Sequence, residues 1–238
     1  MESFLKLAGG TVIDPVSKMA GEVRDIWIRG GKIVSPPTES VAHTTIDVSG
    51  RIVMAGAVDM HCHIAGPKVN TARKMQSEQQ RSNPQSLTAL EDGILHSGSL
   101  GSVPSIFTTG YRYTGLGYTT CFDAAIPPLA ARHAHFEFEQ IPNVDTGFFT
   151  MVGNNHYLMD CIARGDESGL QSFLGWLMNR VGAFAPKIVN PGGVELWKQS
   201  RNGNARDLDQ KVDGFGVTPR QIIQSVTRAA NALELPHP

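Results

Sequence analysis

Cysteine is scarce in this sequence, which contains three in 238 residues. Cys62, Cys121 and Cys161 are too few for a disulfide framework, and they lie too far apart for a Cys-x-x-Cys pair that would carry redox chemistry or bind zinc. We therefore expect three buried, reduced thiols that pack as small apolar side chains. An iron–sulfur cluster is likewise not expected in this chain.

The sequence also lacks an excess of charge of either sign. Its 21 Lys and Arg residues are balanced by 22 Asp and Glu residues, and the basic residues are scattered rather than clustered. Proteins that bind nucleic acid or an anionic membrane use clustered Lys and Arg to neutralise phosphates. Neither nucleic acid nor a membrane is therefore an expected partner.

Long apolar runs are absent as well. The beginning, MESFLKLAGG, has an acidic second residue and no apolar run of signal-peptide length, and no later segment reaches the roughly 20 apolar residues that span a bilayer. We therefore expect a cytoplasmic protein. With 41% hydrophobic and 18% charged residues, the composition is typical of a globular protein with a substantial core.

Two kinds of strand pattern follow each other along the chain. Short β segments separated by Gly, Asp-Pro and Pro-Pro turn signals fill the first part, and they predict a small antiparallel sheet. Later β segments alternate with helical stretches, which is typical of βα units around a parallel sheet. These later segments lie at residues 52–63, 117–125, 146–153 and 186–190. We place the domain boundary between 1–54 and 55–238.

The helical stretches carry clear terminal signals, above all the last one, at residues 218–235. Thr218 is a predicted N-cap, Pro219 is at the first helical position, and Gln221 is at the capping-box position. Four strand–helix units are visible, whereas a (β/α)8 barrel has eight in roughly 250 residues. The predicted fold class is α/β, with a small β-sandwich-like sheet followed by the first half of a (β/α)8 metal-dependent hydrolase barrel. We expect the chain to be a fragment of a longer natural protein.

Two histidines close the first of the barrel segments, in Val-Asp-Met-His-Cys-His. His61 and His63 are two residues apart, so on a strand both imidazoles point to the same side, roughly 6.6 Å apart along it. Neutral imidazole is a preferred zinc ligand, and barrel active sites lie at the carboxyl ends of the strands. The pattern predicts a zinc site here; the alternative is two unrelated surface histidines.

A second pair with the same spacing, His133 and His135, lies in a predicted helix. Residues two apart on a helix diverge by about 200° and cannot converge on one metal, so we expect a solvated or capping face. His43 and His96 are predicted to be loop and helix-surface residues. His156, just past the third β segment, is placed either to face the mouth of the site or to be an ordinary surface residue.

Lys187 lies inside the fourth β segment. Burial depresses the pKa of lysine, and a neutral amine beside a metal can add carbon dioxide to form a carbamate. Such a group acts as a carboxylate and can bridge two metals about 3.5 to 4 Å apart. The alternative is a lysine whose ammonium reaches the rim, and the spacing alone leaves both open. Pro186 lacks an N–H, which suggests that the strand begins there.

Several segments resemble a known family. The stretch D-V-S-G-R-I-V-M-A-G-A-V-D-M-H-C-H is similar to the entry of the amidohydrolase barrel, with Met-Ala-Gly-Ala where Val-Pro-Gly is usual. Further segments that carry the resemblance are I-A-G-P-K-V-N (64–70), T-T-G-Y-R-Y-T-G-L-G-Y-T-T (108–120), A-A-I-P-P-L-A-A-R-H-A-H (124–135), G-N-N-H-Y (153–157) and K-I-V-N-P-G-G-V-E (187–195). Together they resemble the A subunits of formylmethanofuran dehydrogenase and of the formyltransferase/hydrolase complex, across essentially the whole chain.

The resemblance implies a set of site residues. His61 and His63 would bind zinc, and Lys187 would be the carboxylated lysine that bridges two zinc ions. The remaining histidine ligands and the catalytic aspartate of the family lie beyond the last residue, so no catalytic residue is expected within this chain. His237 is close to the next ligand strand but is not taken as a ligand. Possible substrate-site residues are Lys68, Asn190 and His156.

The implied chemistry is hydrolysis, or the reverse condensation, of the N-formyl amide of formylmethanofuran or an analogue, giving formate. The implied cofactors are two zinc ions, with methanofuran or an analogue as the carrier, and the implied partners are the other subunits of the complex, which would perform any redox step. One alternative is a cyclic amidase of the dihydroorotase or hydantoinase type, although segments 110–120 and 187–193 argue against it. The other alternative is a non-catalytic scaffold subunit.

Overall fold

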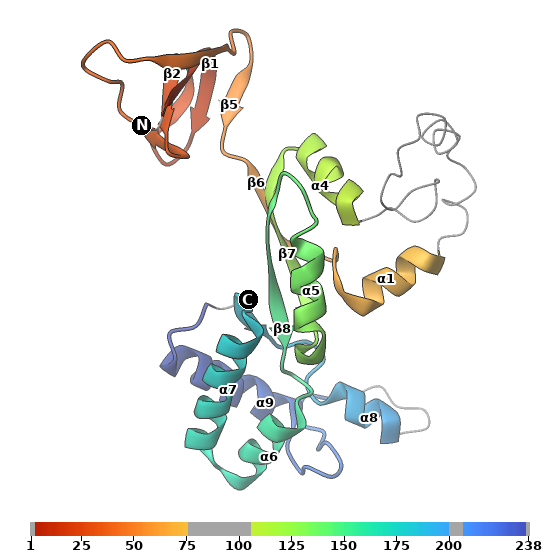
Figure 1. Cartoon of the computed structure of the whole chain (residues 1–238). Coiled ribbons are helices and arrows are strands. Elements are labelled where there is room, and N and C mark those ends of the chain that lie inside the picture. Colours follow the sequence, from red (N-terminus) through yellow and green to blue (C-terminus); the bar gives the residue numbers. More distant parts are fainter. Residues whose placement is uncertain (1–2, 76–105, 200–206, 237–238) are drawn as a thin grey trace. The chain divides into compact units, whose positions relative to one another are not determined.

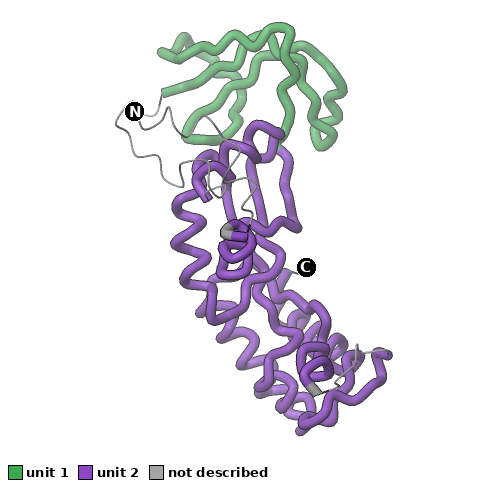
Figure 2. The backbone as a smooth tube through the Cα atoms, turned by 90° about the vertical axis from the view of Figure 1, so that its right-hand side faces the viewer, with its two compact units in different colours: residues 1–56 green, residues 57–238 purple. Residues whose placement is uncertain are grey.

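The computed structural model of the chain describes residues 3–75, 106–199 and 207–236 (Figure 1). The chain separates into two compact units, Met1–Gly56 and Ala57–Pro238 (Figure 2). His96 and His237 lie outside the described residues. Within the described ranges, no helix combines the length and the apolar character needed to cross a membrane.

The first unit is a five-stranded mixed sheet in the order β3-β2-β1-β4, with β5 also paired to β1. Its strands are β1 (Phe4–Asp14), β2 (Met19–Arg29), β3 (Lys32–Val34), β4 (His43–Asp47) and β5 (Ile52–Met54). The β1–β2 and β2–β3 pairs are antiparallel, as predicted, but β4 and β5 run parallel to β1, so the prediction of an antiparallel sheet was wrong for these two strands.

The parallel pairing of β4 with β1 arises because the segment after β3 crosses from the β2 edge to the β1 edge of the β1–β2 hairpin. Trp27 of β2 pairs with Val34 of β3 on one side and with Lys6 of β1 on the other, and Lys6 in turn pairs with Thr45 of β4. Residues 35–42 therefore return the chain to the free edge of β1 at the same level of the sheet. His43 therefore begins a strand and is not the predicted loop residue. Its ring lies 4.8 Å from the Trp27 ring, centroid to centroid.

The second unit contains a four-stranded parallel sheet in the order β6-β7-β8-β9. Its strands are β6 (Ala57–Cys62), β7 (Tyr118–Ile126), β8 (Asp145–Met151) and β9 (Ala185–Lys187). The single strand predicted at 52–63 is two strands, because β5 pairs with β1 whereas the Ala57 N–H donates to the Gly117 carbonyl at 2.9 Å. The strand predicted at 186–190 ends at Lys187, and Asn190, three residues later, has a left-handed φ of 44°.

Helices lie between the strands of this sheet and after its last strand (Figure 1). They are α1 (Gly66–Met75), α4 (Ile106–Gly115), the 3-10 turn η1 (Pro128–Ala130), α5 (Ala131–Phe138), α6 (His156–Arg164), α7 (Glu167–Val181), α8 (Gly193–Gln199) and α9 (Pro219–Ala232). Parallel strands in sequential order with helices between them confirm the α/β class and the first half of a (β/α)8 barrel. The predicted capping box of α9 is present, with the Gln221 N–H donating to Thr218 and the Thr218 N–H to Gln221.

The core of the second unit lies between the sheet and the helices. Its fully buried side chains include Ile126, Phe148, Leu158, Leu174 and Ile222. All three cysteines are free and buried, which confirms the prediction from composition. Burial raises the pKa of Cys121 to about 11 and that of Cys62 still further, so both thiols stay protonated near neutral pH.

Candidate metal centre

The two histidines of the first pair lie at the carboxyl end of β6. His61 is the penultimate residue of the strand and His63 follows it directly. Their ring centroids are 5.7 Å apart and both residues are exposed, whereas Cys62 between them is buried and its Sγ donates to the Phe122 carbonyl at 3.1 Å. Strand alternation therefore brings the two imidazoles side by side above the buried thiol.

A buried carboxylate on β7 holds the turn that follows the histidines. Asp123 is 1% exposed, and its Oδ2 accepts the N–H groups of Ile64 and Ala65 at 2.8 and 3.0 Å. Its Oδ1 accepts the N–H of Ala125 at 3.1 Å and lies 3.8 Å from Nδ1 of His63. The same side chain thus binds the backbone of the turn and faces a predicted metal ligand.

A second carboxylate, Glu137 of α5, continues this support. It accepts hydrogen bonds from the Gly66 N–H and from the side-chain amide of Asn70. Arg73 donates to Asn70 Oδ1 at 3.0 Å and to the Ile64 carbonyl at 2.6 Å. Three successive N–H groups and one carbonyl of the turn are therefore bound by side chains, which leaves the backbone behind His63 little freedom.

These two carboxylates were not predicted from the sequence. Asp123 carried a signal, because it is the single charged residue in the strand YTTCFDAAI and a lone charge in a buried strand needs partners. Glu137 carried none. It stands in His-Phe-Glu-Phe-Glu, where the neighbouring Glu139 is exposed, and only the fold separates the two.

A cavity of about 360 Å³ opens beside His63. Tyr113 on its wall donates its hydroxyl to Asp59 Oδ2 at 3.1 Å, and Asp59 Oδ1 accepts the backbone N–H of His61 at 3.0 Å. Burial raises the pKa of Tyr113, so its hydroxyl stays a donor. The residues that line the cavity include His63, Ile64, Val69, Arg73, Arg112 and Tyr113.

Lys187 lies at the other edge of the sheet. It is the last residue of β9, is half-buried, and its carbonyl accepts the N–H of Val152 at 3.0 Å. Strands β7 and β8 separate it from the histidines of β6. In the part of the chain that the structure describes, no hydrogen bond or ion pair joins Lys187 to either histidine, and no three His, Cys, Asp or Glu side chains gather at metal-binding distance.

The loops that follow β8 and β9 are bound to each other. Asn154 donates to the Asn190 carbonyl at 2.9 Å and accepts the N–H of Val194 at 3.0 Å, and the Gly192 N–H donates to the Gly153 carbonyl at 2.9 Å. A side chain at Gly153 would bring a Cβ to 3.0 Å from the Val189 carbonyl. The chain after Lys187 is therefore held closely against the loop of the preceding strand.

The possible substrate-site residues occupy different places. Lys68 is exposed in the first turn of α1, directly after the histidine turn, and Asn190 is exposed in the loop that follows Lys187. His156 begins α6, with Nε2 3.0 Å from Glu195 Oε1. Lys198, and then His156, hold the pKa of Glu195 below its usual range. His156 thus links α6 to α8 and does not contact the first histidine pair.

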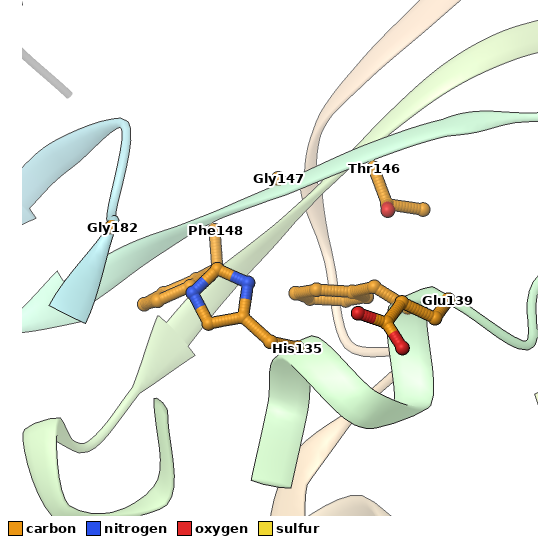
Figure 3. A pocket seen from close by; sticks show the side chains of 7 residues that line it. His135, Glu139, Thr146, Gly147, Phe148 and Gly182 are labelled. Atoms are coloured by element: carbon orange, nitrogen blue, oxygen red, sulfur yellow. The ribbon is translucent and has the colours of Figure 1, made fainter. Parts of the chain in front are cut away.

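The second histidine pair lies on α5, and its rings diverge as predicted. Nε2 of His133 lies 3.1 Å from Glu137 Oε1, whereas Nε2 of His135 lies 2.8 Å from the Val181 carbonyl at the end of α7. The His135 ring also packs against Phe148 and borders a second cavity of about 280 Å³ (Figure 3). This cavity is beside the amino-terminal half of β8, away from the strand end that faces the candidate site.

Comparisons with known proteins identify the family and its relatives. Residues 44–189 match the sequence profile of the amidohydrolase family. Protein FwdA of Methanocaldococcus jannaschii is 39% identical over 237 residues, which cover 100% of this chain and 40% of FwdA. The A subunit of the formyltransferase/hydrolase complex Fhc of Methylorubrum extorquens is 30% identical over 237 residues, which cover 98% of this chain and 40% of its own length.

A solved structure has the same fold. The crystal structure of the formyltransferase/hydrolase complex FhcABCD from Methylorubrum extorquens, in complex with methylofuran, matches with a TM-score of 0.84 and 27% identity. The match covers 99% of this chain and 41% of that chain. The chain thus spans about 40% of the length of the curated relatives that it matches.

Proposed function

Because the chain belongs to the amidohydrolase family, we propose that it is part of a zinc-dependent hydrolase acting on the N-formyl amide of formylmethanofuran or an analogue. The reaction would release formate or, in reverse, condense it with the amine. The observation that carries the proposal is the adjacent imidazole pair at the carboxyl end of β6, in a chain similar along its whole length to one chain of a complex crystallised with methylofuran. Because the chain spans about 40% of the length of these relatives, the activity of the whole protein is part of the proposal.

The donor set of the histidine pair fits zinc. Neutral imidazoles are common zinc ligands, and ligand histidines usually present their second nitrogen to a carboxylate or carbonyl group. His61 and His63 have rings 5.7 Å apart, and the Asp123 carboxylate lies 3.8 Å behind His63. Zinc bound here would polarise the formyl oxygen and activate water near neutral pH.

Lys187 is the proposed third ligand, as a carbamate. The strands β6 and β9 are parallel, so Lys187 and the histidines lie at the same end of the sheet. The first and fourth strands of an eight-stranded barrel lie three positions apart around its wall, so their carboxyl ends border the same opening, where active sites form. Closure of a barrel therefore supports a site that the two edge strands share.

The other residues of this end of the sheet would bind and orient the substrate. Tyr113 presents a protonated hydroxyl in the cavity beside His63. Lys68 and Asn190 stand in the segments that follow β6 and β9, and both are exposed. His156, the first residue of α6, follows the loop after β8 and is the third proposed substrate-site residue. The proposal also includes a cytoplasmic location and assembly with the other subunits of a formyltransferase/hydrolase-type complex.

The proposal is tested on the complete protein by measuring formate release from an N-formyl furfurylamine-type substrate together with bound zinc. Chelation should abolish formate release, and added zinc should restore it. Turnover that persists after zinc removal would contradict the proposal. Hydrolysis of a dihydropyrimidine or hydantoin ring instead of the formyl amide would favour a cyclic amidase, and a protein with neither zinc nor turnover would be a scaffold subunit.

A further inference from the structure

Asp123 stands apart from every other acidic residue that the structure describes, because it is the only buried charged side chain within those ranges. A buried carboxylate is unfavourable by several kcal/mol unless hydrogen bonds compensate its lost hydration. Asp123 accepts three backbone N–H groups, two of them from the turn that begins just after His63. These hydrogen bonds fix the position of the carboxylate, and they also fix the backbone of the turn.

The two oxygens of Asp123 have different tasks. Oδ2 accepts the amides of Ile64 and Ala65, while Oδ1 faces Nδ1 of His63 at 3.8 Å. A movement of the imidazole by about 1 Å would bring this pair to hydrogen-bond length. A proton on Nδ1 then points to the carboxylate, and Nε2 is left with its lone pair free for a cation.

His61 differs from His63 in this respect. Its backbone N–H is bound by Asp59, but in the contacts of the described residues no carboxylate faces its ring. We infer that Asp123 is a positioning residue that orients the His63 ring, selects its Nδ1–H tautomer and holds the turn behind it. This inference rests on the proposed function only for the identity of zinc as the cation.

The direct test is nitrogen NMR of the imidazoles in the zinc-free complete protein, with the His63 signals identified by their loss in His63→Gln. In the wild type, His63 should be mainly the Nδ1–H tautomer, with unprotonated Nε2. In Asp123→Asn, which offers an amide in place of one carboxylate oxygen, the population should move towards Nε2–H. A His63 tautomer that is the same in both proteins would overturn the inference.

Zinc affinity gives a second readout. Loss of an outer-shell partner typically weakens metal binding about 10–100-fold, and we expect a loss in this range for Asp123→Asn in competition with a chelator. The matched control is Asp166→Asn, because Asp166 also accepts a backbone amide, that of Gly169 at 2.8 Å, but as the N-cap of α7. The control should change the melting temperature little, because Asn caps a helix about as well as Asp, and should leave zinc affinity unchanged.

The outcomes separate this inference from the proposed function. An Asp123→Asn protein that melts lower but binds zinc as tightly as the wild type would show a purely structural role. If Asp123→Asn does not fold, the wild-type spectrum alone still tests the inference. A wild-type His63 that is mainly the Nε2–H tautomer would contradict it. A wild-type protein with the expected His63 tautomer but no affinity for zinc would contradict the proposed function and support the positioning role of Asp123.

Discussion

The sequence contains a His-x-His pattern twice, and the two copies have different surroundings. His61 and His63 end a strand, and their rings lie side by side above the buried Cys62. His133 and His135 belong to a helix, and their rings reach different elements of the fold. In both copies the middle residue is buried, so the difference arises from the direction that the backbone gives to the flanking side chains.

This difference shows that the spacing of two ligands has a meaning only together with the backbone conformation. On a strand, side chains two residues apart point to the same side, whereas on a helix their directions differ by about 200°. The surroundings reinforce the contrast. In the first pair the Asp123 carboxylate of the adjacent strand faces His63, whereas in the second pair His133 faces Glu137 of its own helix and His135 caps the last carbonyl of α7.

Removing each histidine pair should have the largest and the most different effects on zinc binding. The double variant His61→Ala, His63→Ala should lose zinc affinity by more than about 100-fold, beyond the loss typical of an outer-shell change. The double variant His133→Ala, His135→Ala should keep its zinc and lose about 1 kcal/mol of stability, because the Val181 carbonyl loses a partner. Elemental analysis and thermal melts of the complete protein measure both. Equal zinc loss from the two variants would remove the distinction.

Lys187 extends the comparison to the opposite edge strand. Lys187→Ala should reduce zinc stoichiometry and lower formate release by about 100-fold, because in the proposed site two nearby cations would lose their bridging anion. Lys187→Arg should fail as badly, since a guanidinium stays protonated and cannot become a carbamate. Short carboxylic acids should restore part of the activity of the alanine variant.

The control for Lys187 is Lys198→Arg, because Lys198 is a half-exposed lysine paired with Glu195 on α8. That variant should retain its zinc and its turnover. Wild-type zinc content and turnover in Lys187→Arg would make Lys187 an ordinary rim lysine, and the shared site of the two edge strands would lose its third ligand.

Two adjacent asparagines, Asn154 and Asn155, separate the positioning of Lys187 from helix capping. Asn154 joins the loop after β8 to the loop after Lys187, whereas Asn155 is the N-cap of α6 and accepts the Leu158 N–H at 3.1 Å. Asn154→Ala should lower formate release about tenfold, because it frees the chain that places Lys187. Asn155→Ala should cost about 1 kcal/mol of stability with little change in turnover. Activity per folded protein, corrected by the melt of each variant, separates the two; the reverse pattern would show that the loops do not position Lys187.

The smallest expected effect concerns Cys62, which lies between the two proposed ligand histidines. Burial, and then the charge of Asp123, raise the pKa of this thiol above its ordinary value of 9.0. A raised pKa favours the protonated form, so its contribution to stability is present below about pH 9 and declines as the pH rises above it. The melting temperature should therefore fall between about pH 8 and pH 10.

Cys62→Ala should remove part of that fall, cost about 1 kcal/mol in lost burial, and leave zinc affinity unchanged, because the Sγ points to the Phe122 carbonyl and not to the histidine side. The same melts in the alanine variant provide the check. A loss of zinc in this variant would contradict the placement of the Cys62 side chain on the side of the strand opposite the two histidine rings.

Features that depend on a few neighbouring residues were determined by the sequence alone. The capping box of α9 involves Thr218 and Gln221, three residues apart, and its prediction was confirmed. The order of strands and helices and the divergence of His133 and His135 have the same local origin. Periodicity and capping act within one or two turns of the chain, so their signals stand in the sequence itself.

Features that join distant segments were decided only by the tertiary structure. Residues 52–63 were predicted as one strand, without the pairing of β5 with β1, and the carboxylates that hold the histidine turn were not identified. Asp123 binds Ile64 across 59 positions of the sequence, and Glu137 binds Gly66 across 71. A buried carboxylate must find its donors wherever the sheet brings them, and the pairing of β6 with β7 places them within reach.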